Sequence, residues 1–177
     1  WFAPNDFKRI FKHRNTRLKG IYIPFWSYDT QVTSAYEGSR GTYYYVTKTR
    51  RGANGKTEHY QERRTQWHDA EGTVYNKFVA IIVSASTSLS TTFSTKLGPW
   101  DLAYLKPFDD QYLSGFIAET FTVDHVQGLV TAKSIMEKVI RRDVENDIGG
   151  DEQEVDFIDS VYNDIKLKYI LLPVWLS

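Results

Sequence analysis

The sequence contains no cysteine. This absence excludes disulfide bridges, thiolate metal sites and a cysteine nucleophile within the chain. Proline and glycine are also sparse, with 5 and 11 residues among 177, while hydrophobic residues make up 41% and aromatic residues 15%. Such a composition is typical of a folded globular chain and not of a disordered one. We therefore expect a single domain over residues 1–177.

Long apolar runs are absent as well. The two longest, residues 78–83 and 169–176, fall well short of the roughly 20 residues that a membrane helix needs. The sequence therefore predicts no membrane span, and we expect a cytoplasmic protein in which any membrane tether lies outside these residues. The chain begins without an initiator methionine or a signal-peptide pattern and stops inside an apolar segment, so we expect an internal fragment of a longer chain.

The chain also lacks a net charge, but its charges are distributed unevenly. Residues 1–67 carry 13 lysines and arginines against 5 acidic residues, whereas residues 68–177 carry 9 against 17. The two parts are therefore electrostatic complements. This asymmetry predicts that the parts fold against each other, or that a basic surface serves an anionic partner, or that the chain associates head to tail with itself.

The first half of the chain has the pattern of antiparallel strands. β-Branched and aromatic residues dominate four segments, which glycine-containing polar stretches separate. An Asn-Gly pair between the second and third segments is a strong signal for a tight hairpin turn. We therefore expect a four-strand antiparallel meander between residues 20 and 83. Its strands are residues 20–36, 42–50, 57–67 and 73–83.

The clearest helix signal lies in the second half. Apolar residues recur at helical spacing in a stripe that includes Val126, Val130 and Val144, and Asp124 or Thr122 can cap its start. The pair Gly149-Gly150 can end it. Further short helices and strands are predicted around it. They are helices at 4–13, 84–97, 98–105 and 107–115, a strand at 116–123, and a C-terminal hairpin of 155–161 and 165–175 with a turn at 162–164.

The predicted fold class is therefore α+β: an antiparallel four-strand meander plus a C-terminal hairpin, covered by one long amphipathic helix and short helices. A pattern, Leu-Lys-x-Ile-x-[Ile/Leu]-Pro-x-Trp, occurs twice, from Leu18 and from Leu167. It predicts a two-fold β repeat, although two apolar strands can also converge on this pattern by chance.

Several motifs together resemble an uncharacterised bacterial family of zinc-ribbon proteins. Members of that family carry an N-terminal zinc ribbon, and they are named after the ribbon of transcription factor IIB or as helicase-like relatives of primosomal protein N′. The resemblance implies that zinc is held only in a separate ribbon preceding this chain, which has no cysteine. The motifs are WFAPN at 1–5, LKGIYIPFWSYD at 18–29, YEGSRGTYYYV at 36–46, GPWDL at 98–102, YLSGF at 112–116, DIGGDEQ at 147–153 and KYILLPVW at 168–175.

The residues themselves offer little catalytic chemistry. The glycine-containing stretch 52–57 is too short for the phosphate-binding loop that a helicase would need. The four histidines never occur at the spacing that places two on one helical face, so we expect no metal or other cofactor in this chain. Acidic pairs such as Asp109-Asp110, or Glu119 with Asp124, can serve acid–base chemistry or can cap helices. Three serines, Ser84, Ser86 and Ser88, lack the glycine-flanked elbow of a hydrolase and are expected to be loop or cap hydroxyls.

The remaining candidate is a basic, aromatic hairpin over residues 42–67. Cations beside exposed aromatic rings can neutralise phosphates and stack bases, which predicts binding of nucleic acid or another anionic partner. Alternatively, alternate tyrosines face the core and the basic side chains only solubilise the surface. The candidate residues are Tyr43, Tyr45, Lys48, Arg50, Arg51, Lys56, Arg63 and Arg64.

The sequence favours a non-enzymatic scaffold or protein-interaction domain, whose sheet docks a partner protein or a second copy of the chain. Binding of nucleic acid or another anionic partner through residues 42–67 is the alternative function. A hydrolytic enzyme with a site outside known motifs is a third.

Overall fold

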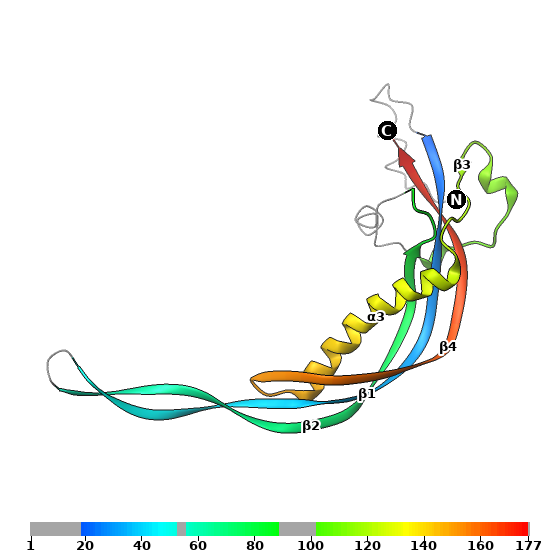
Figure 1. The fold of residues 1–177 in the computed structure, drawn as a ribbon. Coiled ribbons are helices and arrows are strands. Elements are labelled where there is room, and N and C mark those ends of the chain that lie inside the picture. Colours follow the sequence, from blue (N-terminus) through cyan, green and yellow to red (C-terminus); the bar gives the residue numbers. More distant parts are fainter. Residues whose placement is uncertain (1–18, 53–55, 89–101, 177) are drawn as a thin grey trace. The chain divides into compact units, whose positions relative to one another are not determined.

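A computed structural model describes residues 19–52, 56–88 and 102–176. Strands hold 62% of these residues and helical segments 22%. Three strands are far longer than the usual 3–10 residues. The elements are β1 (Lys19–Arg51), β2 (Thr57–Ser84), η1 (Leu102–Tyr104), η2 (Asp110–Leu113), β3 (Ile117–Ala118), α3 (His125–Ile148) and β4 (Glu152–Leu176). Between the short strand β3 and the long strand β4, the described chain forms one α-helix (Figure 1).

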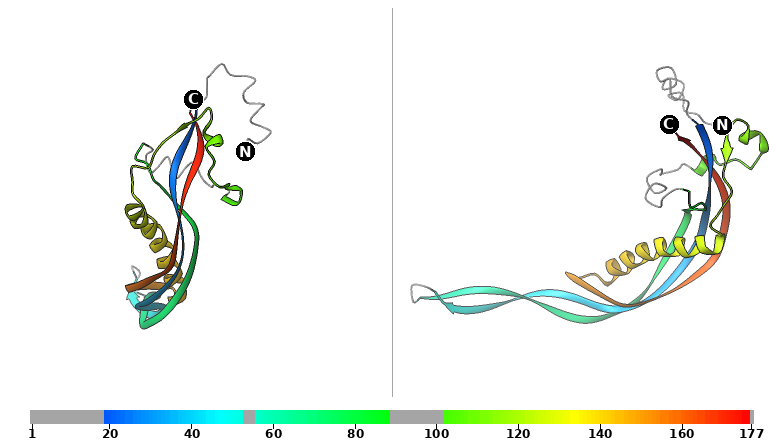
Figure 2. Two further views of the ribbon diagram at one scale, coloured as in Figure 1. Left: turned by 90° about the vertical axis from the view of Figure 1, so that its right-hand side faces the viewer. Right: turned by 45° about the horizontal axis from the view of Figure 1, so that its top comes forward.

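The strands form one mixed sheet around β1. The order is β2-β1-β3, and β4 also pairs with β1. β1 and β3 are parallel, with Ile21 beside Ile117. β2 and β4 each run antiparallel to β1 (Figure 2). As the residue numbers along β1 rise, the numbers of the residues that β1 contacts on β2 fall, and so do those on β4.

The predicted α+β class is wrong, because the described chain is mostly β. The predicted four-strand meander is wrong as well: β1 runs through residues 37–41 and β2 through 69–72, where turns were expected. Only the turn after Arg51 matches the prediction; its Asn-Gly pair lies outside the described residues, and the Gly52 amide donates to the Lys56 carbonyl oxygen at 2.8 Å.

The glycines that suggested turns instead leave room for neighbouring strands. A Cβ on Gly72 would lie 2.6 Å from the Tyr36 hydroxyl, and one on Gly41 would lie 2.7 Å from the Thr65 methyl group. A Cβ on Gly38 would overlap the carbonyl oxygen of Glu154. None of these glycines has a positive φ. They therefore act as sites of close approach inside strands, a role that glycine also has in sheets.

The predicted C-terminal hairpin is also wrong, because β4 continues through residues 162–164. This part of β4 stays bound to β1: the Thr30 hydroxyl donates to the backbone carbonyl oxygen of Asn163 at 2.7 Å, and just before the stretch Ser34 and Ser160 share a hydrogen bond of 2.7 Å. Asp164 has a φ of +51°, so the irregularity that suggested a turn is a local left-handed residue within a strand.

The chain divides into two compact units. One contains residues 1–29, 79–133 and 166–177, and its core includes Phe25 and Leu172. The other contains residues 30–78 and 134–165, and it buries apolar side chains from β1 and α3. These buried side chains are Val32, Tyr36, Met136, Ile140, Val144 and Ile148.

The helix predicted after Asp124 is confirmed. The Asp124 carboxylate accepts a hydrogen bond from the Gln127 amide at 2.8 Å, and Gly149 follows the last turn with a φ of +65°. The predicted apolar stripe is only partly right, since Val126 and Val130 are 61% and 60% exposed. The buried positions instead recur every fourth residue. They are 128, 132, 136, 140, 144 and 148.

The smaller predicted elements have mixed outcomes. The helical connectors expected at 98–105 and 107–115 correspond to the short helices η1 and η2. The strand expected at 116–123 is reduced to the two residues of β3. The helix at 4–13 lies outside the described residues, as does most of that at 84–97. The described start of the second is not helical: Ser84 ends β2, and residues 85–88 belong to neither a helix nor a strand. No helix in the described part of the chain is both long and apolar enough to cross a bilayer.

Candidate functional site

All but Tyr43 of the residues predicted to form a binding surface lie on the part of the β1–β2 hairpin that has no third strand among the described residues. β4 begins at Glu152, whose carboxylate accepts a hydrogen bond from the Tyr43 hydroxyl at 2.7 Å. Beyond Tyr43, β1 therefore pairs only with β2 among the described residues. We call residues 44–51 and 56–64 the distal hairpin. None of these residues is buried.

Tyrosines are exposed on both faces of the distal hairpin. Tyr44 is 42% exposed, Tyr45 62% and Tyr60 40%, and the neighbouring positions Tyr44 and Tyr45 point to opposite faces because side chains alternate along a strand. The alternative that alternate tyrosines face a core does not describe this segment. Tyr60 was missed as a candidate, although it lies on the returning strand of the predicted hairpin, where the Arg50 guanidinium is 5.9 Å from the centroid of its ring.

Cations of the distal hairpin are placed beside carboxylates and rings. Lys48 and Arg64 both form ion pairs with Glu62, and Arg50 pairs with Glu58 at 2.9 Å. The hydrogen bond from Lys48, followed by that from Arg64, lowers the pKa of the Glu62 carboxyl. The structure thus gives three of the predicted cations a carboxylate partner.

Three further cations contact an aromatic ring or are exposed. The Arg63 guanidinium lies 4.2 Å from the centroid of the Tyr43 ring, within the range of a cation–π contact. The hydrogen bond to Glu152 raises the pKa of the Tyr43 hydroxyl. Arg51 and Lys56 are exposed next to the turn. The candidate residues therefore lie on both faces of one hairpin, and much of their positive charge is already balanced.

A second surface was not predicted as a site: the first part of β4. Residues 151–159 include five acidic side chains and no basic one, and Phe157 beside them is 57% exposed. Among the described strands, β4 pairs only with β1, so its other edge has unpaired backbone groups. The acidic run could have been recognised in the sequence, but its position at a sheet edge could not.

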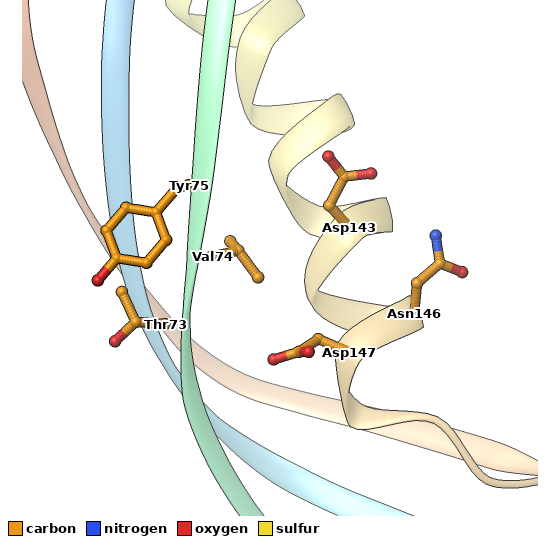
Figure 3. Close-up of a pocket in the computed structure, with 6 residues that line it drawn as sticks. All are labelled: Thr73, Val74, Tyr75, Asp143, Asn146 and Asp147. Atoms are coloured by element: carbon orange, nitrogen blue, oxygen red, sulfur yellow. The ribbon is translucent and has the colours of Figure 1, made fainter.

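An open hollow of about 460 Å³ lies between β2 and the C-terminal part of α3. In Figure 3, Val74 points toward the helix and Asp147 toward β2, whereas Tyr75 lies on the other side of the strand. Asp147 accepts a hydrogen bond from the Tyr36 hydroxyl at 2.6 Å, and Asp143 accepts one from the Asn76 amide at 2.6 Å. Burial, aided by Asp147, raises the pKa of Tyr36 to about 12. Both carboxylates thus support the packing of α3.

The other polar candidates hold the backbone in place. Asp109 caps η2 through the Gln111 amide, and Asp124 caps α3, as the cap interpretation predicted. Glu119 accepts hydrogen bonds from the hydroxyls of Ser86 and Ser88 at 2.9 and 2.6 Å. In the described part of the chain, no group of three or more histidine, aspartate or glutamate side chains is arranged to hold a metal ion.

Comparison with known proteins gives a distant relative and no function. The chain is similar to the uncharacterized protein YdjG of Bacillus subtilis (strain 168), with 25% identity over 169 residues. The match covers 90% of this chain and 44% of YdjG, so the chain spans less than half the length of that relative. No family model and no solved structure matches the chain. The zinc-ribbon resemblance therefore stays a prediction.

Proposed function

We propose that this chain is a protein-interaction domain and that the distal hairpin is its binding element. The observation that carries the proposal is the exposure of Tyr44, Tyr45 and Tyr60 on a two-stranded segment without any buried residue. A two-stranded hairpin is marginally stable in water by itself. Tyrosine is enriched where proteins contact each other, since it buries a large apolar area and keeps a polar tip.

The charge of the hairpin favours an anionic partner. Residues 42–67 carry six lysines and arginines against two glutamates, so a net positive charge remains after the internal ion pairs. Positive and negative patches that face each other accelerate association and suppress wrong partners. The partner that fits this surface is a protein with an acidic, partly apolar face.

The ion pairs distinguish this proposal from the alternative of nucleic-acid binding. A surface that tracks phosphates depends on cations that can release counterions. Lys48, Arg50 and Arg64 instead have carboxylate partners, which favours a protein partner. Both functions place the contact on the same hairpin, so binding must be measured with each class of partner.

Affinity purification of the full-length protein from its native cell tests the proposal. The variant Tyr44→Ser/Tyr45→Ser/Tyr60→Ser should lose the partners that the wild-type protein captures. The matched control is Tyr75→Ser, which removes a tyrosine that is 78% exposed on β2 outside the distal hairpin and should capture the same partners as wild type. Equal capture by the triple variant would contradict the proposal.

Nucleic-acid binding is tested in parallel by fluorescence anisotropy with a labelled oligonucleotide over a range of salt. If the wild-type chain binds the oligonucleotide at all, the proposal predicts that the variant Arg50→Glu/Arg51→Glu binds it too. Tight binding at low salt that this variant removes would instead establish the alternative.

A further inference from the structure

The sheet of the second unit has two unpaired edges of opposite charge. Among the described strands, one is the outer edge of β4 over residues 152–159, and the other is the edge of β1 over residues 44–51, on the side away from β2. Exposed strand edges present rows of unpaired amide and carbonyl groups, which another strand can satisfy by joining the sheet.

The charges of the two edges are complementary. Glu152, Glu154 and Asp156 have even numbers and thus project from one face of β4, and Asp159 adds a fourth carboxylate on the other face. The β1 edge holds Lys48, Arg50 and Arg51 without an acidic residue. Side chains directly across a strand pair interact when they share a face. Glu154 and Asp156 can therefore face Lys48 and Arg50, whereas Glu152 already accepts hydrogen bonds within its own chain.

Apolar surface accompanies the charges on both edges. Phe157 and Val161 of β4 are 57% and 55% exposed, and Tyr45 of β1 is 62% exposed. The guanidinium of Arg50 remains accessible beside Glu58, since the Arg50 side chain is 69% exposed. A strand that joins either edge would therefore bury apolar area and gain ion pairs, in addition to backbone hydrogen bonds.

We propose that the partner of this interaction domain is a second copy of the chain, with the β4 edge of one copy paired to the β1 edge of the next. This inference rests on the proposed function and names its partner. The two surfaces differ, so the contact is head to tail, and in a dimer one copy keeps its β1 edge unpaired while the other keeps its β4 edge unpaired. Association therefore continues from dimers to longer chains.

Sedimentation velocity over a range of protein concentrations tests the proposal. At low salt the wild-type chain should form a series of oligomers that grows with concentration, and high salt should shift it toward monomers because surface charges are screened. A wild-type chain that stays monomeric at every concentration in low salt would overturn the inference without the use of any variant.

Two charge-reversal variants locate the contact. Arg50→Glu/Arg51→Glu and Glu154→Lys/Asp156→Lys should each raise the dissociation constant at least about tenfold, since like charges then face each other. The matched controls are Arg141→Glu/Arg142→Glu, an adjacent exposed arginine pair on α3, and Asp69→Lys/Glu71→Lys, an exposed acidic pair with the same spacing on β2. Both controls should assemble as the wild type does. Circular dichroism and melting curves verify that all four variants are folded.

Mixing the two charge-reversal variants gives the sharpest result. Each variant alone has two edges of like charge and should stay monomeric. In an equimolar mixture the unchanged edges still match, and the two reversed edges are again of opposite charge, so the mixture should regain the oligomers of the wild type. No association in the mixture would contradict the head-to-tail arrangement. The same variants are compared in the affinity purification: capture of a different protein with self-association absent would refute only this inference and leave the proposed function standing.

Discussion

Gly72 of β2 lies directly against the ring of Tyr36 on β1, so close that a Cβ on Gly72 would be 2.6 Å from the tyrosine hydroxyl oxygen. That ring is nearly fixed, since Tyr36 is 5% exposed and its hydroxyl donates to Asp147 at 2.6 Å. The glycine is therefore required by the side chain of the neighbouring strand, and β2 passes through this point without turning.

Gly72→Ala should lower the free energy of unfolding by roughly 1–3 kcal/mol, because the added methyl group overpacks a site that cannot expand freely. Denaturant unfolding measures the change. The double variant with Tyr36→Leu should show a smaller cost for Gly72→Ala than the single variant does, since the clashing ring is gone. Equal costs in both backgrounds would show that the ring is not the cause.

The contact between Gly72 and Tyr36 illustrates which features of the fold can be predicted from the sequence and which cannot. Alternation of residues and the Asn-Gly pair give the hairpin, and apolar spacing with Asp124 and Gly149 gives the helix. Gly38, Gly41 and Gly72 were misinterpreted because a glycine in a polar stretch is typical of a turn. Glycine occupies these positions because a side chain or backbone from a distant part of the sequence lies close to them. The local pattern does not show that contact.

Gly128→Ala is expected to destabilise the protein, although alanine is the better helix former by about 1 kcal/mol. The reason is packing: a Cβ on Gly128 would lie 2.7 Å from the Tyr28 hydroxyl and 2.8 Å from Cδ1 of Trp26. Both rings are held, because Tyr28 donates to the His125 carbonyl oxygen and Trp26 to that of Val123. Thermal melting measures the effect.

A control variant on α3 shows whether the sign of the stability change at Gly128 reflects packing or helix propensity. Ser134→Ala replaces an exposed residue of α3 and should raise stability slightly or leave it unchanged. If Gly128→Ala also raised the melting temperature, close packing at Gly128 would be disproved.

Asp29 should make stability depend on pH in the acid range. The Ala80 amide, followed by the Lys168 ammonium at 2.9 Å, lowers the pKa of the Asp29 carboxyl below its ordinary value of 3.8. A carboxyl whose pKa is lower in the folded state contributes stability that is complete above its unfolded pKa and is lost as the pH falls through the folded pKa. Asp29→Asn should therefore flatten the acid slope of the unfolding free energy.

Variants of Lys168, the ion-pair partner of Asp29, serve as the comparison. Lys168→Met should flatten the same slope in part, whereas Lys168→Arg keeps a cation there and should retain it. Unfolding free energies measured between pH 2 and 6 check this order. An unchanged slope in Asp29→Asn would show that the carboxyl has no favoured charged state in the fold.

Ala80→Gly is expected to stabilise the protein by about 1 kcal/mol, because Ala80 has a φ of +58°, where an L-residue with a Cβ is strained and glycine is not. Ala70→Gly, also on β2 but without a positive φ, should destabilise instead. Denaturant unfolding of the two variants gives opposite signs if the backbone at Ala80 is strained, and the same sign if it is not.

The hairpin over residues 42–67 could be predicted from the sequence, but the exposure of its rings and its ion pairs could not. The partners Glu58 and Glu62 follow only from cross-strand register, which places Glu62 near Lys48 and Glu58 near Arg50. The unpaired edges depend on where β4 begins, which is a tertiary feature that no local pattern determines.

The central claim, that the distal hairpin contacts a protein partner, is tested most directly by photo-crosslinking in living cells. A photoreactive phenylalanine analogue replaces Tyr45 in one variant and Tyr75, exposed outside the distal hairpin, in another. We expect a protein adduct after illumination from position 45 and none from position 75. Adducts from position 75 with none from position 45 would contradict the account.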